Sequence, residues 1–235
     1  MKTIRCACFV LGASATLLGA PQLRAQLGSG DGFLFRVPTV RVALSGGYAQ
    51  PRGRSDIYDF VTNSLTLERR DFGAGAIGAS AEFRVTPRME LGLNASFSGR
   101  SAGSQSRHFV GDDDLPVEQT TSLLRAALMA TGRLSLVSPG RAVGRYAWIP
   151  TRVVPFIGGG VGPVWYRLRQ NGEFVDDQTL DIFEDTFEST AFSAGATAFG
   201  GADLSLTPHF GMTAQGRYLW AKGAMNHDFS TFNKI

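Results

Sequence analysis

The chain has 235 residues, a formal net charge of +3, 43% hydrophobic residues and 18% charged residues. That length allows one large all-β domain or two small ones, and the ordinary apolar fraction argues against a disordered chain. Beyond the N-terminus, no apolar run reaches the roughly 18 residues that a membrane helix needs. The composition therefore excludes a helical membrane protein and disfavours a highly charged nucleic-acid binder.

The first 25 residues predict a cleaved secretory signal. Lys2 and Arg5 precede an apolar stretch over residues 6–20, and Leu23-Arg24-Ala25 then offers a cleavage site after Ala25. A membrane anchor is the alternative, but an apolar stretch of about 15 residues is short for a span. Cleavage removes three basic residues and both cysteines, so 20 Lys and Arg balance 20 Asp and Glu. The mature chain is then neutral, without thiol chemistry or net attraction to polyanions.

Period-two alternation of apolar and polar residues predicts β-strands along the rest of the chain. The clearest segment is 89–98, where Leu91 and Leu93 alternate with Glu90 and Asn94. Segment 124–137 opens like a helix, but Gly132 would cost a helix about 1 kcal/mol. The seven predicted strands lie within residues 40–48, 72–85, 89–98, 124–137, 153–169, 190–206 and 210–220.

The connections alternate between short turns and long polar loops. Thr-Pro turns stand at 86–87 and 207–208, and a third short connection begins at Ser138. The long connections are 49–71, 99–119, 170–189 and the residues after Lys222. This order indicates an up-and-down antiparallel sheet.

Charged residues lie in the middle of the polar faces, among small residues, and this favours a closed barrel. A soluble β-sandwich or a lipocalin-like barrel would place such faces in water, whereas an eight-stranded membrane barrel encloses them in a narrow lumen. An outward charge at the bilayer midplane would cost about 2–4 kcal/mol, and the assigned apolar faces carry none there. The predicted lumen network comprises Arg41, Glu82, Arg84, Glu90, Arg125, Arg133, Asp203 and Arg217.

Aromatic residues at the ends of the apolar faces predict the two girdles that flank the hydrocarbon layer. They are Tyr48, Phe83, Phe97, Tyr166, Phe210, Tyr218 and Trp220. The sequence therefore predicts an all-β, antiparallel up-and-down transmembrane β-barrel with eight strands, seven of them complete. The eighth is expected to begin after Phe232, so we expect the chain to be truncated before its last strand. The expected organisation is a signal peptide over 1–25, a periplasmic segment over 26–36 and the barrel over 37–235.

Residues 37–232 resemble the small eight-stranded outer-membrane barrels of the OmpA, OmpX and OmpW type. The segment Val154-Pro-Phe-Ile-Gly-Gly-Gly-Val-Gly162 is similar to a Pro-aromatic-x-Gly-x-Gly strand of that group. The resemblance implies a bacterial outer membrane, a periplasmic N-terminus and long loops facing outside. It also implies contact with outer-membrane lipids or lipopolysaccharide, passage through the barrel assembly machinery, and a monomer. No nucleic-acid partner is expected.

Several motifs suggest chemistry, each with a plainer interpretation. Gly73–Gly78 matches a dinucleotide fingerprint without the flanking strand and helix, and residues 158–162 lack the Lys and Ser/Thr of a phosphate loop. Gly99-Arg-Ser101-Ala-Gly103 matches a nucleophile elbow but precedes a poor helix. His108, or His227 with Ser230, would suit a lipid A hydrolase only beside a suitable partner at the membrane rim. The acidic loop around residues 173–188 could hold Ca²⁺, although solvated charge is the simpler interpretation.

The sequence thus favours a structural, membrane-integrity or surface-interaction role for a barrel whose lumen is filled by side chains. The alternatives are a narrow porin-like channel for small solutes, a lipid A-modifying hydrolase of barrel architecture and a soluble exported binder. We expect no enzyme activity, catalytic residue, metal or cofactor.

Overall fold

The computed structural model describes residues 8–17, 33–51, 66, 68–110, 116–144, 147–175 and 182–221. Their elements are β1 (Cys8–Leu17), β2 (Val40–Pro51), the 3-10 helix η1 (Arg69–Phe72), β3 (Ala74–Arg84), β4 (Met89–Val110), β5 (Pro116–Ser135), β6 (Gly140–Val143), β7 (Ala147–Pro150), β8 (Val153–Val175), β9 (Ile182–Ser205) and β10 (Phe210–Ala221). No helix in the described part of the chain is long and apolar enough to cross a membrane.

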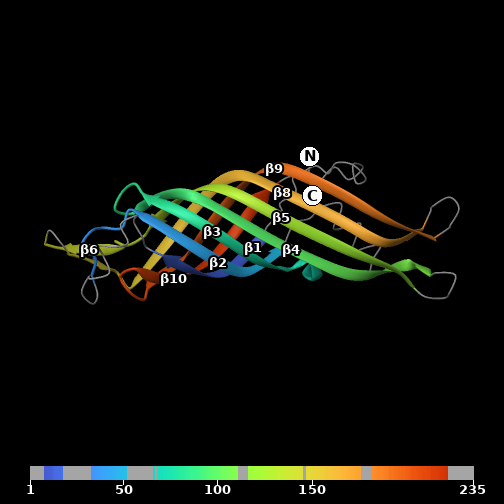
Figure 1. Cartoon of the computed structure of the whole chain (residues 1–235), viewed down its shortest axis with the longest axis horizontal. Coiled ribbons are helices and arrows are strands. Elements are labelled where there is room, and N and C mark those ends of the chain that lie inside the picture. Colours follow the sequence, from blue (N-terminus) through green and yellow to red (C-terminus); the bar gives the residue numbers. More distant parts are fainter. Residues whose placement is uncertain are drawn as a thin grey trace.

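Eight strands close into an antiparallel barrel in the order β1-β10-β9-β8-β5-β4-β3-β2 (Figure 1). Of the described strands, only the two in the small β6–β7 hairpin stand outside this up-and-down order. Closure leaves no unpaired strand edge around the barrel, which is the condition for a sheet that crosses hydrocarbon. The predicted fold class is confirmed.

The strand that closes the barrel comes from an unexpected part of the chain. β1 pairs with both β10 and β2, with Ala15 opposite Met212 on one side and Leu44 on the other. This strand lies inside the predicted signal peptide, whereas we expected the eighth strand after Phe232, which lies outside the described residues. The sequence of β1 explains why it was missed. Phe9, Leu11 and Leu17 share one row with two alanines, but the other row contains Val10 among Gly, Ser and Thr, so the low polarity of the stretch hides the period-two pattern. Cleavage after Ala25 stays a prediction.

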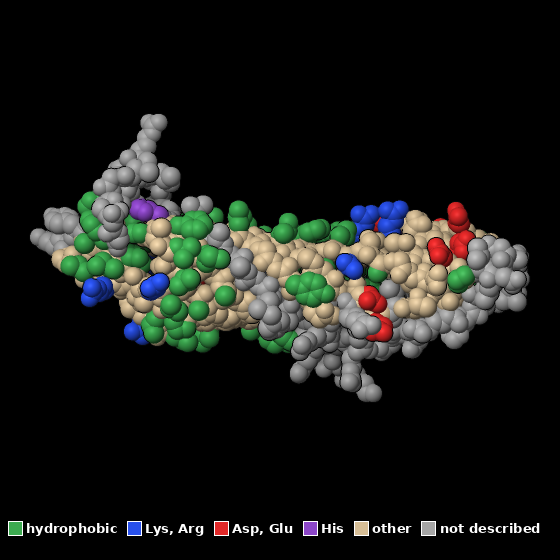
Figure 2. Space-filling view, turned by 90° about the horizontal axis from the view of Figure 1, so that it is seen from below, with side chains coloured by type: hydrophobic (Ala, Val, Ile, Leu, Met, Phe, Trp, Pro, Cys, Tyr) green, Lys and Arg blue, Asp and Glu red, His purple; other side chains and the backbone are tan. Residues whose placement is uncertain are grey.

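The apolar rows face outward and the charged rows face inward. Leu91, Leu93, Leu128 and Leu134 are 48%, 56%, 49% and 42% exposed, whereas Arg125 is only 6% exposed. A soluble two-layer protein would show the reverse arrangement. Hydrophobic side chains cover the part of the surface nearer the turns, as Figure 2 shows for one face. This belt is what a membrane-spanning barrel requires.

Four neighbouring strands are about twice as long as the others. β4, β5, β8 and β9 have 22, 20, 23 and 24 residues, against 12, 11 and 12 in β2, β3 and β10. Their far halves form what we call the projecting sheet: residues 99–110, 116–124, 167–175 and 182–190. Nine residues of strand span about 30 Å, and this sheet forms the right-hand end of Figure 1.

The connection after Ser138 is larger than predicted. It contains the β6–β7 hairpin, whose turn includes Gly144 at a φ of 65°. Trp148 of β7 is buried and forms an isolated bridge with Leu34, with backbone N–O distances of 2.8 and 2.7 Å. Strands of four residues are too short to produce a readable alternation, which is why the sequence did not reveal them.

Candidate functional site

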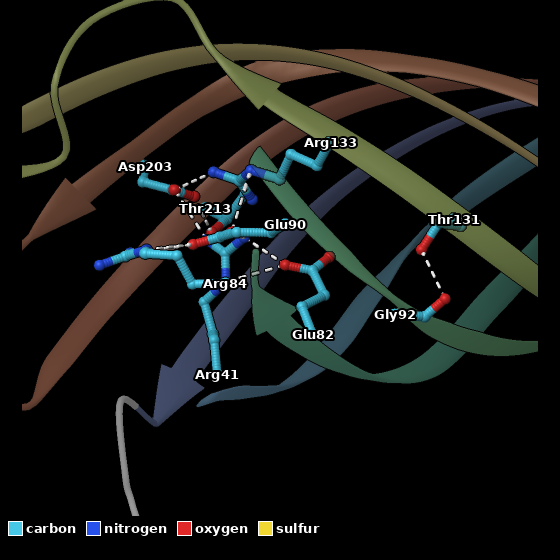
Figure 3. A network of polar contacts seen from close by, with 9 residues as sticks. All are labelled: Arg41, Glu82, Arg84, Glu90, Gly92, Thr131, Arg133, Asp203 and Thr213. Carbon is cyan, nitrogen blue, oxygen red and sulfur yellow. Dashed lines mark hydrogen bonds and ion pairs between the residues drawn. The ribbon is translucent and has the colours of Figure 1, made fainter. Parts of the chain in front are cut away.

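An ionic network fills the lumen near the short turns, with Arg41 at its centre (Figure 3). Its guanidinium Nη1 donates to Asp203 Oδ2 over 2.8 Å, its Nη2 to Glu90 Oε2 over 2.5 Å, and its Nε to Glu82 Oε2 over 2.9 Å. Strand register creates this arrangement, because Arg41 stands directly opposite Glu82. One arginine therefore links strands β2, β3, β4 and β9 across the lumen.

Two further arginines complete the network. Arg84 Nη2 donates to Glu90 Oε1 over 2.9 Å, and Arg133 bonds Asp203. Thr213 Oγ1 also donates to Asp203, over 2.6 Å. Three guanidinium groups thus pair with three carboxylates. Buried charges require such pairing and hydrogen bonding to offset the free energy of removing them from water.

Aromatic rings continue the packing above the network. The Arg133 guanidinium lies 3.5 Å from the centroid of the Phe156 ring, and Arg217 lies 5.3 Å from that of Phe199. The two rings contact each other at 6.4 Å between centroids. Neither ring was predicted to lie in the lumen, although period-two spacing places Phe199 on the same face of segment 190–206 as the inward-facing Asp203.

An apolar cluster fills the lumen nearer the projecting sheet. Its buried members are Phe72, Leu123, Met129, Val164, Tyr166, Leu168, Ala191 and Ala221. Tyr166, predicted for an outer girdle, is only 3% exposed and belongs to this cluster, so that prediction was wrong. The lumen changes from ionic near the turns to apolar farther along the barrel, so the inward row of β8 is apolar at Tyr166. Alternation alone does not show which of the two rows of a strand faces the lumen.

The other predicted girdle residues lie on the outer surface. Tyr48, Phe83, Phe97, Phe210 and Trp220 are exposed, and Tyr218 is half-buried with its ring centroid 4.5 Å from that of Trp220. The two remaining predicted lumen arginines, Arg125 and Arg217, lie inside but outside the ion pairs around Arg41.

Both ends of the lumen are covered. Trp148 lies at the turn end, with the Arg84 guanidinium 5.9 Å from its ring centroid. At the other end, η1 delivers the buried Phe72 into the apolar cluster. Between them the space near the network is divided into cavities of about 60, 20 and 30 Å³. Around the described residues of the network, these cavities are too small to form a wide passage.

The catalytic motifs have structural explanations. Ser101 lies within β4, where its Oγ is 2.6 Å from Ser122 Oγ, so no nucleophile elbow exists there. The glycines at 73–78 enter β3 and those at 158–162 lie within β8. A Cβ on Gly158 would come within 2.4 Å of the Phe199 ring, which explains a glycine at that position.

The lipid A hydrolase hypothesis and the Ca²⁺ hypothesis both involve residues that the structure does not describe. His227 and Ser230 lie outside the described residues, as do three acids of the loop, Asp176, Asp177 and Asp181. Within the described ranges, no group of three His, Cys, Asp or Glu side chains could hold a metal ion.

Fold and site together define a small membrane-spanning β-barrel with a lumen filled by side chains. No family model and no curated protein matches the chain. Among solved structures, it is similar to Ail, the attachment invasion locus protein of Yersinia pestis, solved in complex with the heparin analogue sucrose octasulfate. The two share 8% identity at a TM-score of 0.25, over 94% of this chain and 99% of that one. The fold assignment comes from the strand order of the chain itself.

Proposed function

We propose that this protein is an outer-membrane barrel that closes its own lumen and presents the projecting sheet at the cell surface for contact with other macromolecules. The observation that carries the proposal is the difference in strand length. A membrane strand needs about 9–11 residues, which β2, β3 and β10 supply, so the far halves of β4, β5, β8 and β9 extend beyond the lipid.

The projecting sheet offers one unpaired edge among the described residues. Among the described strands, β10 pairs with β9 only from Gly195 onward, so none of them lies beside residues 182–186 of β9 on that side. The opposite edge, on β4, is partly covered: Thr66 N donates to Gln105 O over 2.9 Å, and Gln105 N donates to Thr66 Oγ1 over 3.0 Å. An open edge can accept an added strand from a partner.

The side chains near this edge favour a basic partner. Glu184 and Asp185 are exposed on β9, whereas Glu188 already accepts a hydrogen bond from Arg167 of β8. We infer that an extended segment carrying Lys or Arg adds to β9, with main-chain hydrogen bonds supplying affinity and the carboxylates selecting charge.

Lipid contact is the second part of the proposal. On the outward row of β8, Arg167 and Arg169 follow Trp165, which stands at the end of the apolar belt. Phosphate groups of lipopolysaccharide or another anionic lipid would meet these guanidinium groups at that height. Passage through the barrel assembly machinery and a monomeric state belong to the same proposal.

Cysteine labelling on intact cells tests the surface placement. Glu184→Cys is expected to react with a membrane-impermeant maleimide, because the projecting sheet would face the medium. The matched variant Thr207→Cys, at an exposed short turn, should react only after the envelope is permeabilised. The parent chain gives the background from its own cysteines. Equal labelling of both variants on intact cells would overturn the proposal.

A further inference from the structure

A wide apolar groove crosses the outer surface of the barrel over six neighbouring strands, β2, β3, β4, β5, β8 and β9. Its volume is about 840 Å³, which lies within the range of small-molecule sites. Ala79 and Ala95, which face each other across β3 and β4, lie in its floor. Larger side chains stand beside them, and Leu44, Ile77 and Phe192 are 67%, 66% and 73% exposed. The short alanine side chains therefore leave a depression within the lipid-facing belt.

The groove climbs from the middle of the belt toward the projecting sheet. Leu44, at one end, is four residues from Val40, where β2 begins at the turn end of the barrel. Phe192, at the other end, is 13 residues from Ser205, where β9 meets a turn. Five strand spacings of about 4.8 Å make the groove about 24 Å long, and a strand tilt of roughly 40° makes it rise about 15 Å along the membrane normal. This height is about half of the 30 Å hydrocarbon layer, which is the depth of one leaflet.

Two arginines stand beyond the upper end of the groove, on the outward row of β8. Arg167 and Arg169 follow Trp165, which lines the groove. Arg167 Nη2 donates to Glu188 Oε2 over 2.7 Å, whereas Arg167 Nε has no hydrogen-bond partner. Arg169 is exposed, and its charge acts on the same carboxylate. Two guanidinium groups thus face one carboxylate, so these three side chains together are cationic at the height where the apolar belt ends.

We propose that one lipid molecule binds at this place, with an acyl chain in the groove and its phosphate group at Arg167 and Arg169. This inference rests on the lipid contact proposed above and adds a defined site with one lipid per barrel. Lipid tails are as apolar as the groove, so within a bilayer the chain is held by shape and dispersion. The guanidinium groups select the phosphate, because they form charge-assisted and bidentate hydrogen bonds with it.

Native mass spectrometry of the full chain, released from a nonionic detergent, counts the lipids that stay bound. With dimyristoyl phosphatidic acid we expect one retained lipid per barrel, and with dimyristoyl phosphatidylcholine we expect much lower retention. Arg169→Gln should weaken retention about tenfold, the change expected when one hydrogen bond to a charged group is lost. Arg88→Gln, at an exposed turn, should leave it unchanged. Equal retention of the two lipids by the wild-type chain would overturn the proposal.

A second pair of variants tests the groove itself. Ala95→Phe fills its floor and leaves both arginines in place, so the bound lipid should be lost. Ala130→Phe is the matched control, because Ala130 is also exposed on the outward face but does not line the groove. Both changes add apolar bulk on the lipid side, and gel migration of unheated samples reports whether each barrel has folded.

Two results would overturn the proposed site. One is equal lipid retention by Ala95→Phe and Ala130→Phe. The other is a dimer without lipid in the wild-type spectrum, which would show that a second copy of the chain covers the groove. Neither result bears on the surface labelling of Glu184→Cys, so failure of this site is distinguishable from failure of the proposed surface placement.

Discussion

At the scale of single residues, Arg41 lies at the centre of the ionic network in the lumen. It is buried and bonds three carboxylates from three other strands. A buried network of this kind is costly to break at one member, because the partners that remain are charged and poorly solvated.

Arg41→Met should therefore destabilise the barrel by about 3–5 kcal/mol, the cost expected when one partner of a buried ion pair is removed. Urea unfolding in lipid vesicles, followed by tryptophan fluorescence, measures the change in the free energy of unfolding. The control Arg88→Met, at an exposed turn, should stay within about 0.5 kcal/mol of wild type. An unchanged unfolding midpoint for Arg41→Met would contradict a stabilising network.

A solvent-accessible pair in the projecting sheet gives a pH-dependent prediction. The hydrogen bond from Arg167 Nη2 to Glu188 Oε2, 2.7 Å long, lowers the pKa of Glu188; desolvation opposes this, and the charges of Arg167 and Arg169 add to it. Because the folded-state pKa is depressed, the stabilisation is present above the unfolded pKa and is lost as pH falls through the folded one. Arg167→Gln should raise the Glu188 pKa in a carboxyl NMR titration, and Arg169→Gln should raise it less. A larger rise with Arg169→Gln would contradict the assignment of the hydrogen bond as the main cause.

At the scale of elements, closure rests on β1. The slot between β2 and β10 accepts ten residues of strand on both sides. The same residues have the composition of a signal peptide, so cleavage after Ala25 and closure by β1 cannot both hold for one molecule. Without a strand in this slot, β2 and β10 would present unpaired backbone groups to lipid, at a cost of several kcal/mol per group.

We expect a chain of residues 26–235 to fail to refold into a heat-resistant barrel in detergent, whereas the full chain refolds. A synthetic peptide of Cys8–Leu17 added during refolding should restore the barrel, and a scrambled peptide of the same composition should not. The folded fraction is measured by comparing the gel migration of heated and unheated samples. If the shorter chain folds as well without the peptide as the full chain does, then closure of the barrel does not depend on β1.

At the scale of the whole molecule, three layers close the lumen in series. They are the cover at Trp148, the network with the Arg133–Phe156 stack, and the apolar cluster that holds Phe72. A closed lumen agrees with the small diameter of an eight-stranded barrel.

Because the layers act in series, removing any one of them should leave the conductance of a planar bilayer near background. Trp148→Ala, Arg133→Ala and Phe72→Ala are each expected to show no steady current, whereas the triple variant should show frequent openings. A steady current through the unaltered protein would instead favour the narrow-channel alternative.

The sequence by itself determined the existence of seven barrel strands, with the halves of β4, β5, β8 and β9 that lie nearer the turns. It also determined the outward leucine rows and the inward charges, because alternation is a local property that each segment carries alone. It also indicated that Arg41, Glu82, Glu90 and Asp203 share one interior. Only the tertiary structure decided which strand closes the barrel, that Tyr166 and Phe199 point inward, and that Trp148 covers one mouth. Those outcomes depend on register and on how side chains from distant strands share a confined volume, and no single segment contains that information.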